Sequence, residues 1–548
     1  MRLKKFIKWF GIITASFLIL LLLAGFVISW YYNSFKSEYP SGGILSENEQ
    51  NYDVIFYNIN LLVDLDNEAI SGNTTVKIKS LTSKLDIIEL DLIDLYKVDS
   101  VTINNQNAKF RHVAHKLLIT PSKPILKSDI LDLNVSYAGQ PPEAKYPPWL
   151  GGFTWAEDDS GNAWVGLSCQ GEGAKIWIPC KDHPTDEPDS VAINITVPGE
   201  YFVASNGILR NVTKNGNGLE TYHWITHYPI NNYLINFGIG KFIEVKDTYI
   251  AEDGTRIPVV FYVLPQLLFG ADHFVAEVKD ALHSYSKYFG EFPWKNEKCG
   301  FLNTPFSGME HQTLIAYGND YRTTHVDSFT FDPLLVHELA HEWWGNEVTI
   351  HDWADFWIQE GITTYAEALY VLDKAGEQAY YDYMMKNNER ILNNRPLISE
   401  PNSNSSDAYH SDIYNKGAAF MHTLRYVLCD SVFFPTLKEF ATDSSYILQN
   451  KVDTEDFLDL VNKNSGNDLS ELFHLYLNTT KLPQISIDSV AFDMYDICIP
   501  NINFKTPMDV SYNHTIKRML LGPDTIQVKS SDWPVVDKNN WYLKDGDI

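Results

Sequence analysis

Two histidines and a following glutamate have the types and spacing of a catalytic zinc site. His337 and His341 stand four residues apart in VHELAHEWWG, so on a helix they lie on one face about one turn apart. Glu360, nineteen residues after His341, opens a second predicted helix. Two imidazoles and a carboxylate are a common set of catalytic zinc ligands, and they leave a fourth position open. A surface helix that carries the H-E-x-x-H pattern by chance is the alternative, and the position of Glu360 argues against it.

Two further glutamates are placed to assist such a site. Glu338 lies beside the histidine pair, where it can act as a general base on water rather than bind the metal. A zinc ion lowers the pKa of a bound water towards ~7. Glu367 follows Glu360 by two helical turns, and we expect it to accept a hydrogen bond from a ligand imidazole. An ordinary solvated glutamate is the alternative for Glu367.

The sequence around these residues resembles the M1 (gluzincin) aminopeptidases, whose pattern is H-E-x-x-H, eighteen residues, then E. Three further stretches resemble the same family: YFGEFPWKNEKCGFLNTPFSGMEHQT, DIYNKGAAFMHTLR and WIPCKDHPTDEP. The opening YDVIFYNINLLVDLDNEAISGNTTVKIKS resembles the family's first β-hairpins. The resemblance runs from about residue 50 to at least residue 480. It implies a zinc-dependent aminopeptidase that hydrolyses the N-terminal bond of peptides with a free amine.

The resemblance also assigns roles to residues that their own spacing does not single out. It places the catalytic tyrosine at Tyr414, whose hydroxyl would stabilise the oxyanion. An ordinary core tyrosine is the alternative. It places the acceptor of the substrate α-ammonium at Glu310, with Gly308 and Met309 beside the substrate backbone. A charge-assisted contact of this kind would let such an enzyme recognise the free amine of the first residue.

A Gln-x-Glu pair in SCQGEGAKIW resembles the strand of the family that meets the same ammonium group. The pair is Gln170 and Glu172, and a polar loop is the alternative. Two departures from the family pattern bear on substrate preference. Ser307 and His311 stand where the G-x-M-E-N segment has Gly and Asn. The chain after residue 480 is also too short for the large helical C-terminal domain of typical members, so we expect a more open cleft.

Strand and helix patterns predict a multidomain α+β protein. Alternating apolar and polar residues predict an antiparallel β-domain over residues 49–244, after a polar linker at 37–48. Helical periodicity predicts a mainly helical domain over residues 245–482, and the family resemblance implies that this is a thermolysin-like catalytic domain. Its helices are expected near 271–290, 333–345, 359–374, 376–392, 414–430, 454–463 and 469–477. Residues 483–548 return to alternation and predict a small β-domain.

An uncharged apolar run near the N-terminus predicts a membrane anchor. Residues 9–32 carry no charge, and about 20 residues suffice to span a bilayer as a helix. Four cationic residues precede the run: Arg2, Lys4, Lys5 and Lys8. This bias predicts a single-pass protein in which residues 1–36 form a cytoplasmic stub and transmembrane helix, with the catalytic domain on the extracytoplasmic side. A cleaved signal peptide is the alternative, although the run exceeds the roughly 7–15 residues usual for one.

Composition excludes several classes of protein. The 548 residues include 43 Lys and Arg against 70 Asp and Glu, and the net charge of −27 argues against a nucleic-acid binder. The 45% hydrophobic content excludes a disordered chain. Five cysteines are too few for a disulfide scaffold and leave a Cys169–Cys180 bridge open.

Taken with the motifs and the apolar run, the favoured function is a membrane-anchored zinc aminopeptidase of unspecified oligomeric state. A thermolysin-like endopeptidase and a non-catalytic, peptidase-like ectodomain are the alternatives.

Overall fold

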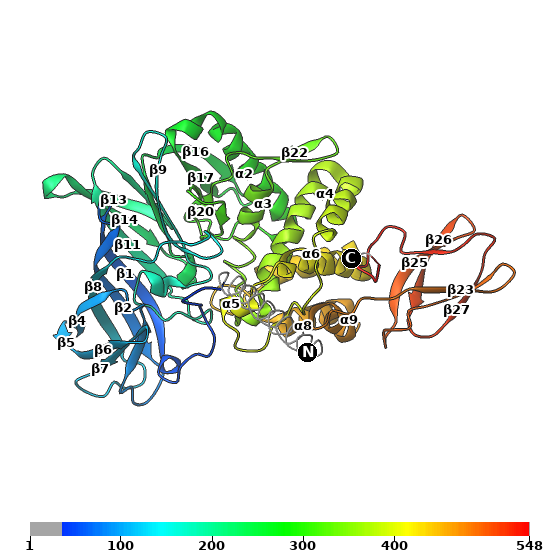
Figure 1. Cartoon of the computed structure of the whole chain (residues 1–548), viewed down its shortest axis with the longest axis horizontal. Helices are drawn as coiled ribbons and strands as arrows, with labels where there is room; N and C mark the ends of the chain where they lie inside the picture. Colours follow the sequence, from blue (N-terminus) through cyan, green and yellow to red (C-terminus); the bar gives the residue numbers. More distant parts are fainter. Residues whose placement is uncertain (1–35, 547–548) are drawn as a thin grey trace, which may run out of the picture.

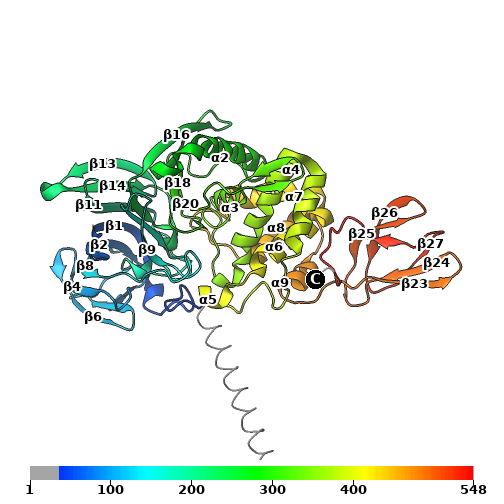
Figure 2. The same cartoon turned by 45° about the horizontal axis from the view of Figure 1, so that its top comes forward.

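The computed structural model describes residues 36–546, which form three parts arranged in a row (Figures 1 and 2). A β-rich part stands at the N-terminal end, a mainly helical part lies in the middle, and a second β-rich part stands at the C-terminal end. This arrangement agrees with the predicted multidomain α+β class. The domain boundaries at residues 244 and 482 stay predictions.

The N-terminal part contains three sheets. The largest has eight strands in the order β13-β14-β11-β1-β2-β8-β4-β5, and it is joined by a four-stranded sheet, β12-β15-β10-β9, and a three-stranded sheet, β3-β7-β6. The strands are β1 (Tyr52–Asp64), β2 (Ala69–Ser80), β3 (Ile88–Asp91), β4 (Lys97–Ile103), β5 (Gln106–Asn107), β6 (Lys109–Val113), β7 (Lys116–Thr120), β8 (Ile130–Gly139), β9 (Gly152–Glu157), β10 (Ala163–Ser168), β11 (Ser190–Pro198), β12 (Phe202–Ser205), β13 (Ile208–Lys214), β14 (Leu219–Thr226) and β15 (Phe237–Gly240).

The alternation that predicts these strands also decides which side chains are buried. In β1, Ile59, Leu61 and Val63 are buried and the residues between them are not, because successive side chains of a strand point to opposite faces. A register shift between Val54 and Phe56 marks an irregularity in the pairing with β2. One pair corrects the predicted antiparallel domain, since β1 and β11 run parallel. These two strands are far apart in the sequence, so the connection is long enough for a crossover and alternation alone does not fix their direction.

The helical part begins on a five-stranded sheet, β16-β17-β18-β20-β19, in which β19 is an edge strand. Its strands are β16 (Ile243–Ile250), β17 (Arg256–Val263), β18 (Cys299–Asn303), β19 (Gly308–Met309) and β20 (Ile315–Tyr317), followed by the hairpin β21 (Thr324–Val326) and β22 (Phe329–Phe331). The helices are α2 (Leu268–Phe289), α3 (Pro333–Ala340), α4 (Trp357–Asn388), α5 (Ser405–Ala408), α6 (Asp412–Leu428), α7 (Asp430–Thr442), α8 (Thr454–Ser465) and α9 (Ser470–Leu477).

Helix α4 is broken near its middle. Gly376 has a non-helical backbone (φ 84°), and this agrees with the two separate helices predicted before and after residue 375. The second half folds back onto the first, since the Tyr380 hydroxyl lies 2.9 Å from that of Tyr365 and the Tyr383 hydroxyl donates to Glu367. Helix α7 was not predicted from the sequence, and it carries Pro435 within it.

The C-terminal part consists of two small sheets, β23-β24-β27 and β26-β25-β28. Its strands are β23 (Ser486–Ala491), β24 (Met494–Cys498), β25 (Thr506–Tyr512), β26 (Thr515–Leu521), β27 (Ile526–Lys529) and β28 (Val535–Val536). The chain then returns to the helical part. The Trp541 ring stacks on His422 of α6 at 4.6 Å, and the Thr423 hydroxyl donates to the Trp541 carbonyl at 2.8 Å. These contacts join the last sheets to α6.

The N-terminal segment, residues 36–51, is packed between the first two parts rather than extended as a free spacer. The Ser41 N–H donates to the Gly171 carbonyl (3.0 Å), and the Ser41 carbonyl accepts from the Ser405 N–H of α5 (2.9 Å). The Ser405 hydroxyl also donates to the Gly171 carbonyl at 2.5 Å. Lys36 pairs with Asp407 of α5 at 2.9 Å. The polar composition that predicts a linker therefore serves hydrogen bonds to both neighbouring parts.

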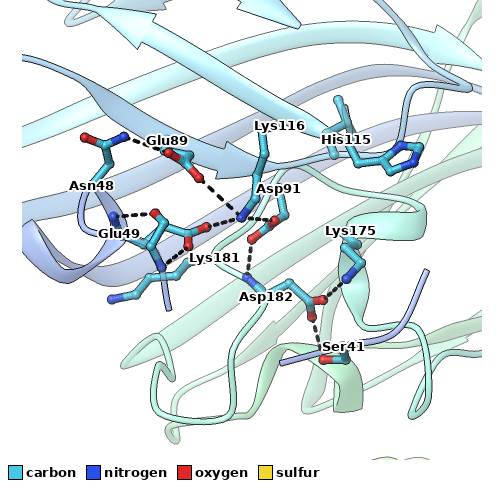
Figure 3. Close-up of polar contacts among 12 residues, drawn as sticks. Ser41, Asn48, Glu49, Glu89, Asp91, His115, Lys116, Lys175, Lys181 and Asp182 are labelled. Atoms are coloured by element: carbon cyan, nitrogen blue, oxygen red, sulfur yellow. Dashed lines mark hydrogen bonds and ion pairs between the residues drawn. The ribbon is translucent and has the colours of Figure 1, made fainter. Parts of the chain in front are cut away.

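A buried ionic cluster holds the same segment to the N-terminal sheets (Figure 3). The ammonium of Lys116 contacts Glu49 at 3.0 Å, Glu89 at 3.4 Å and Asp91 at 2.6 Å. Asp182 accepts from Ser41 at 3.1 Å, and it pairs with a lysine, Lys175, at 2.8 Å. Buried carboxylates of this kind are tolerated when each is paired and hydrogen-bonded. The cluster therefore holds the N-terminal segment at Ser41 and at Glu49.

The predicted membrane anchor and the possible Cys169–Cys180 disulfide have different outcomes. The apolar run at residues 9–32, the predicted anchor, lies outside them. Within residues 36–546, no helix combines the length and the apolar character needed to cross a membrane. All five cysteines are described and unpaired, and Cys169 and Cys180 are both buried, so the open alternative of a disulfide between them is not realised.

Candidate metal centre and substrate cavity

A cavity of about 510 Å³ brings most of the predicted site residues together. Its walls come from the loop after β10, the edge strand β19, and the helices α3, α4 and α6. The predicted residues that line it are Gln170, Gly308, Met309, Glu310, His337, Glu338, His341, Glu360, Glu367 and Tyr414. The volume is in the range of small-molecule sites, which are typically about 300–1,000 Å³.

Helix α3 carries His337 and is followed directly by His341, and its first residues form a strong helix N-cap. The Asp332 side chain accepts hydrogen bonds from the N–H groups of Leu334 and Leu335, and Pro333 occupies the first turn, where a missing N–H costs nothing. The helix ends at Ala340, earlier than the predicted residue 345. His341 keeps helical backbone angles as the C-cap, so the two imidazoles still share one face.

The three predicted ligands converge on one point. The Nε2 atoms of His337 and His341 lie 3.2 Å apart, and Oε2 of Glu360 lies 3.6 and 3.4 Å from them, respectively. The outer nitrogens face acceptors: Nδ1 of His337 is 2.7 Å from Glu367, and Nδ1 of His341 is 2.7 Å from the Trp344 carbonyl. These acceptors place the ring protons on Nδ1 and leave the Nε2 lone pairs facing each other.

This arrangement fits a zinc ion. Two ligands of one tetrahedral zinc at about 2.0–2.1 Å are about 3.3 Å apart, close to the separation of the two Nε2 atoms. Oε2 of Glu360 is buried without a hydrogen-bond partner among the described residues, and facing lone pairs repel unless a cation lies between them. In the absence of a metal, the charge of the two histidines outweighs burial and lowers the pKa of Glu360.

Helices α4 and α6 set the distance between the ligand Glu360 and the predicted catalytic tyrosine. They cross at Gly361 and Gly417, where a Cβ on Gly361 would lie 2.9 Å from the Gly417 Cα. This close approach brings α6 against the ligand helix. The Tyr414 ring then stacks beside His337, with ring centroids 6.0 Å apart, and its hydroxyl pKa is raised well above the usual value by burial and by the Glu360 charge.

Glu338 lies beside the ligands and is not one of them. Its carboxylate groups with Glu310 and His341, and one ligand atom from each lies within 4.8 Å of the others. Burial raises the pKa of Glu338 to about 8 in the absence of bound metal. Gly308 packs directly against it, since a Cβ at that position would lie 2.5 Å from Oε1. A side chain at position 308 would therefore displace the Glu338 carboxylate.

The predicted ammonium acceptor and its amide partner meet across a long sequence separation. The Gln170 amide donates to Glu310, and it lies 3.4 Å from Oε1 of Glu360. Glu310 follows β19, and β19 pairs with β20 on one side only. The edge of β19 lines the cavity through Gly308 and Met309, where a substrate backbone can lie alongside it.

Glu172 differs from the prediction. Its carboxylate accepts from the Gly151 N–H at 3.0 Å, and it is not among the residues that line the cavity. Residues i and i+2 share a face only in an extended strand. Here β10 has already ended, and the N–H groups of Glu172 and Gly173 both turn back to the Cys169 carbonyl. The turn separates Glu172 from Gln170 and directs it to the Gly151 backbone.

The two departures from the family pattern have different surroundings. Ser307 lines the cavity, so this replacement bears on its shape. His311 is fully buried away from the cavity, with Nδ1 3.0 Å from the Asn236 amide nitrogen, and burial lowers its pKa to about 3. His311 is therefore a neutral group of the interior.

Other residues at the site were not predicted. The Tyr233 hydroxyl donates to Glu310 at 3.2 Å, and the Asn346 amide donates to the Glu310 carbonyl at 2.9 Å. Tyr383 donates to Glu367, which in turn accepts from His337. Tyr233 and Tyr383 lie in segments that no motif marks. The chain holds 31 tyrosines, so the residue type alone does not single them out. Only their contacts distinguish them.

Comparison with known proteins agrees with this geometry. Residues 53–234 match the Peptidase M1 N-terminal domain, and residues 275–476 match the Peptidase family M1 domain. Leucine aminopeptidase 2 of Vanderwaltozyma polyspora is 26% identical over 442 residues, which cover 75% of this chain and 63% of the relative. Aminopeptidase B of Mus musculus is 25% identical over 64% of this chain and 53% of the relative. The chain thus spans between about half and two thirds of the length of these two curated relatives.

A solved structure shares the fold. It is an M1 zinc metallopeptidase mutant from Deinococcus radiodurans bound to a Tyr-Ser-Ala substrate, with a TM-score of 0.67 and 23% identity. The match covers 81% of this chain and 97% of that one. The two domain matches together account for most of the described residues. This chain belongs to the M1 peptidase family.

Proposed function

We propose that the protein is a zinc aminopeptidase that hydrolyses the first peptide bond of peptides with a free N-terminus. The observation that carries the proposal is the convergence of two imidazole nitrogens and a buried carboxylate, with Glu310 and Gln170 beside them. Two of the relatives are named aminopeptidases, and the Deinococcus structure is bound to a Tyr-Ser-Ala substrate. These similarities support the same activity.

Each side chain has one task in this reaction. His337, His341 and Glu360 would hold zinc, which supplies a Lewis acid and lowers the pKa of water at the site. Glu338 takes a proton from the attacking water and returns it to the leaving amine. The Tyr414 hydroxyl donates a hydrogen bond to the scissile carbonyl as it gains negative charge. Glu367 holds the His337 ring in place through Nδ1.

The free amine is recognised by a carboxylate acceptor at one end of the cavity. Glu310 offers a carboxylate, which accepts from the Gln170 amide nitrogen, and the same nitrogen lies 3.4 Å from Oε1 of the ligand Glu360. A buried carboxylate without a cation is costly, so a substrate ammonium gains a strong contact there. This acceptor favours an aminopeptidase over a thermolysin-like endopeptidase, whose substrates carry no charge next to the scissile bond. A non-catalytic ectodomain would have no need for Glu338 and Tyr414.

The acceptor role predicts a selective loss of preference in Glu310→Ala. The wild type should cleave free-amine peptides far faster than their N-acetylated forms. The variant should lose roughly 10²-fold in kcat/KM on free-amine peptides and little on acetylated ones, because only the former carry the ammonium. Paired assays on both peptide sets, with and without a chelator, measure this. Equal cleavage of free and acetylated peptides by the wild type would instead support the endopeptidase.

We also propose that residues 9–32 anchor the enzyme in a membrane, with its N-terminus in the cytoplasm and the catalytic part on the extracytoplasmic side. The length of the apolar run and the preceding positive charges support this. N-terminal sequencing of the mature protein should find the run retained. A mature start near residue 30 would identify a signal peptide.

A further inference from the structure

The substrate cavity has a second end of opposite charge. Lys386 and Arg390 line the same cavity as the metal site, and both residues are exposed. Neither forms an ion pair or a side-chain hydrogen bond with any residue in the range 36–546. The carboxylates that line the cavity are Glu310, Glu338, Glu360 and Glu367, and they gather around the metal site.

A series of contacts places the metal ligands between the two ends of the cavity. Glu310 and Gln170 adjoin the ligand Glu360 at one side. From there the contacts run through His337 to Glu367, and from Glu367 to Tyr383. The metal ligands therefore lie between the ammonium acceptor and Tyr383.

The two cations follow Tyr383 at the C-terminal end of α4. Lys386 lies three residues after Tyr383 in the last turn of α4, and Arg390 lies two residues beyond the end of the helix, in a turn where its N–H donates to the Asn387 carbonyl. The break at Gly376 is what turns this part of α4 back towards the site. The hairpin β21–β22 packs against the same half, with the Phe331 and Tyr383 rings 5.8 Å apart, and Thr324 of this hairpin lines the cavity.

We infer that Lys386 and Arg390 form a subsite for a substrate carboxylate on the leaving-group side of the scissile bond. The inference rests on the proposed function, because the acceptor for the ammonium and the metal site fix the direction of the peptide. The first side chain of the substrate branches next to the ammonium, at the Glu310 end. A carboxylate at the cationic end therefore belongs to residues after the scissile bond.

The geometry also selects the substrate class. An extended peptide advances by about 3.3–3.6 Å per residue, and one turn of helix rises about 5.4 Å. Two cations four residues apart, one in the last helical turn and one just beyond it, can thus meet the C-terminal carboxylate of a peptide with one or two residues after the scissile bond. Dipeptides and tripeptides carry an ammonium and a carboxylate at such a spacing, matching the two ends of the cavity. An aspartate or glutamate side chain soon after the scissile bond would present the same chemistry.

Free and amidated peptides of increasing length test this inference. The wild type should prefer the free carboxylate over the amide in dipeptides and tripeptides, and this preference should fade in pentapeptides. Lys386→Gln and Arg390→Gln should each raise KM for the free dipeptide and tripeptide about fivefold to tenfold with little change in kcat. The double variant should treat free and amidated peptides alike. Lys438→Gln removes the same charge from an exposed position outside the cavity and should change neither parameter.

Further substrates distinguish a C-terminal carboxylate from a side-chain carboxylate. They also distinguish failure of the subsite from failure of the proposed function. Amidated peptides with glutamate at the second or third position report a side-chain carboxylate at the same subsite. Substrates with glutamate at the first position should be unaffected by the variants, and a loss confined to them would overturn the leaving-group assignment. Aminoacyl amide fluorogenic substrates lack any carboxylate. Turnover of these together with equal cleavage of free and amidated short peptides would overturn the subsite, whereas no turnover at all would contradict the proposed function.

Discussion

Glu338→Gln is expected to lower kcat by roughly 10²–10⁴-fold or more while leaving the zinc content and the fold unchanged. The amide has nearly the same shape as the carboxylate but cannot accept a proton from the attacking water. Because Glu338 is not among the three converging ligands, the metal should stay bound. Single-turnover rates with a short free-amine peptide, together with metal analysis and a melting curve, measure the three quantities.

A matched variant controls for the change in charge. Glu455→Gln makes the same substitution at an exposed position of α8, and no described ion pair involves it. It should keep wild-type kcat. A near-normal kcat in Glu338→Gln would remove Glu338 from the proposed mechanism.

Glu360→Ala is expected to lose most of the bound metal and, with it, the activity. Glu360 is the third of three converging ligands, and alanine leaves two imidazoles without the charge that balances a divalent ion. Elemental analysis after dialysis against metal-free buffer should find well under one zinc per chain in the variant. Full occupancy of the variant would contradict the assignment of Glu360 as a ligand.

Glu367→Gln gives a graded comparison for the same measurement. Glu367 contacts His337 through Nδ1 and does not converge with the ligands, so its amide should weaken zinc binding by roughly 10–100-fold rather than abolish it. A zinc titration with a competing chelator separates the two variants. Equal losses in both would mean that Glu360 acts only by holding a histidine.

The metal ligands could be predicted from the sequence because their geometry is local. His337 and His341 need only a helix to share a face, and Glu360 needs only a second helix to return. The break in α4 was equally local, since the helical pattern lapses next to Gly376. The contact of Gln170 with Glu310 joins residues 140 positions apart, and only the family resemblance pointed to it.

Features that depend on tertiary contacts could not be predicted from the sequence. The pairing of Gln170 with Glu172 assumed an extended strand, and the turn onto the Cys169 carbonyl removes that condition. The direction of β11 against β1 follows from the path of a long connection, which alternation does not encode. Nothing in the sequence distinguishes Lys386 from other surface lysines. The return of the second half of α4 places it in the cavity.

The docked N-terminal segment determines where a shortened recombinant version of the protein can begin. The family match starts at residue 53, and a truncation designed on that boundary would discard Ser41 and Glu49. The cut would expose the Gly171 carbonyl and the α5 backbone that the segment covers, next to the loop that presents Gln170. Recombinant fragments for crystallisation or assay should therefore retain the chain from Lys36 onward. A protease that clips this stretch in preparations would be expected to loosen the junction beside the catalytic cavity while leaving every catalytic side chain in the polypeptide.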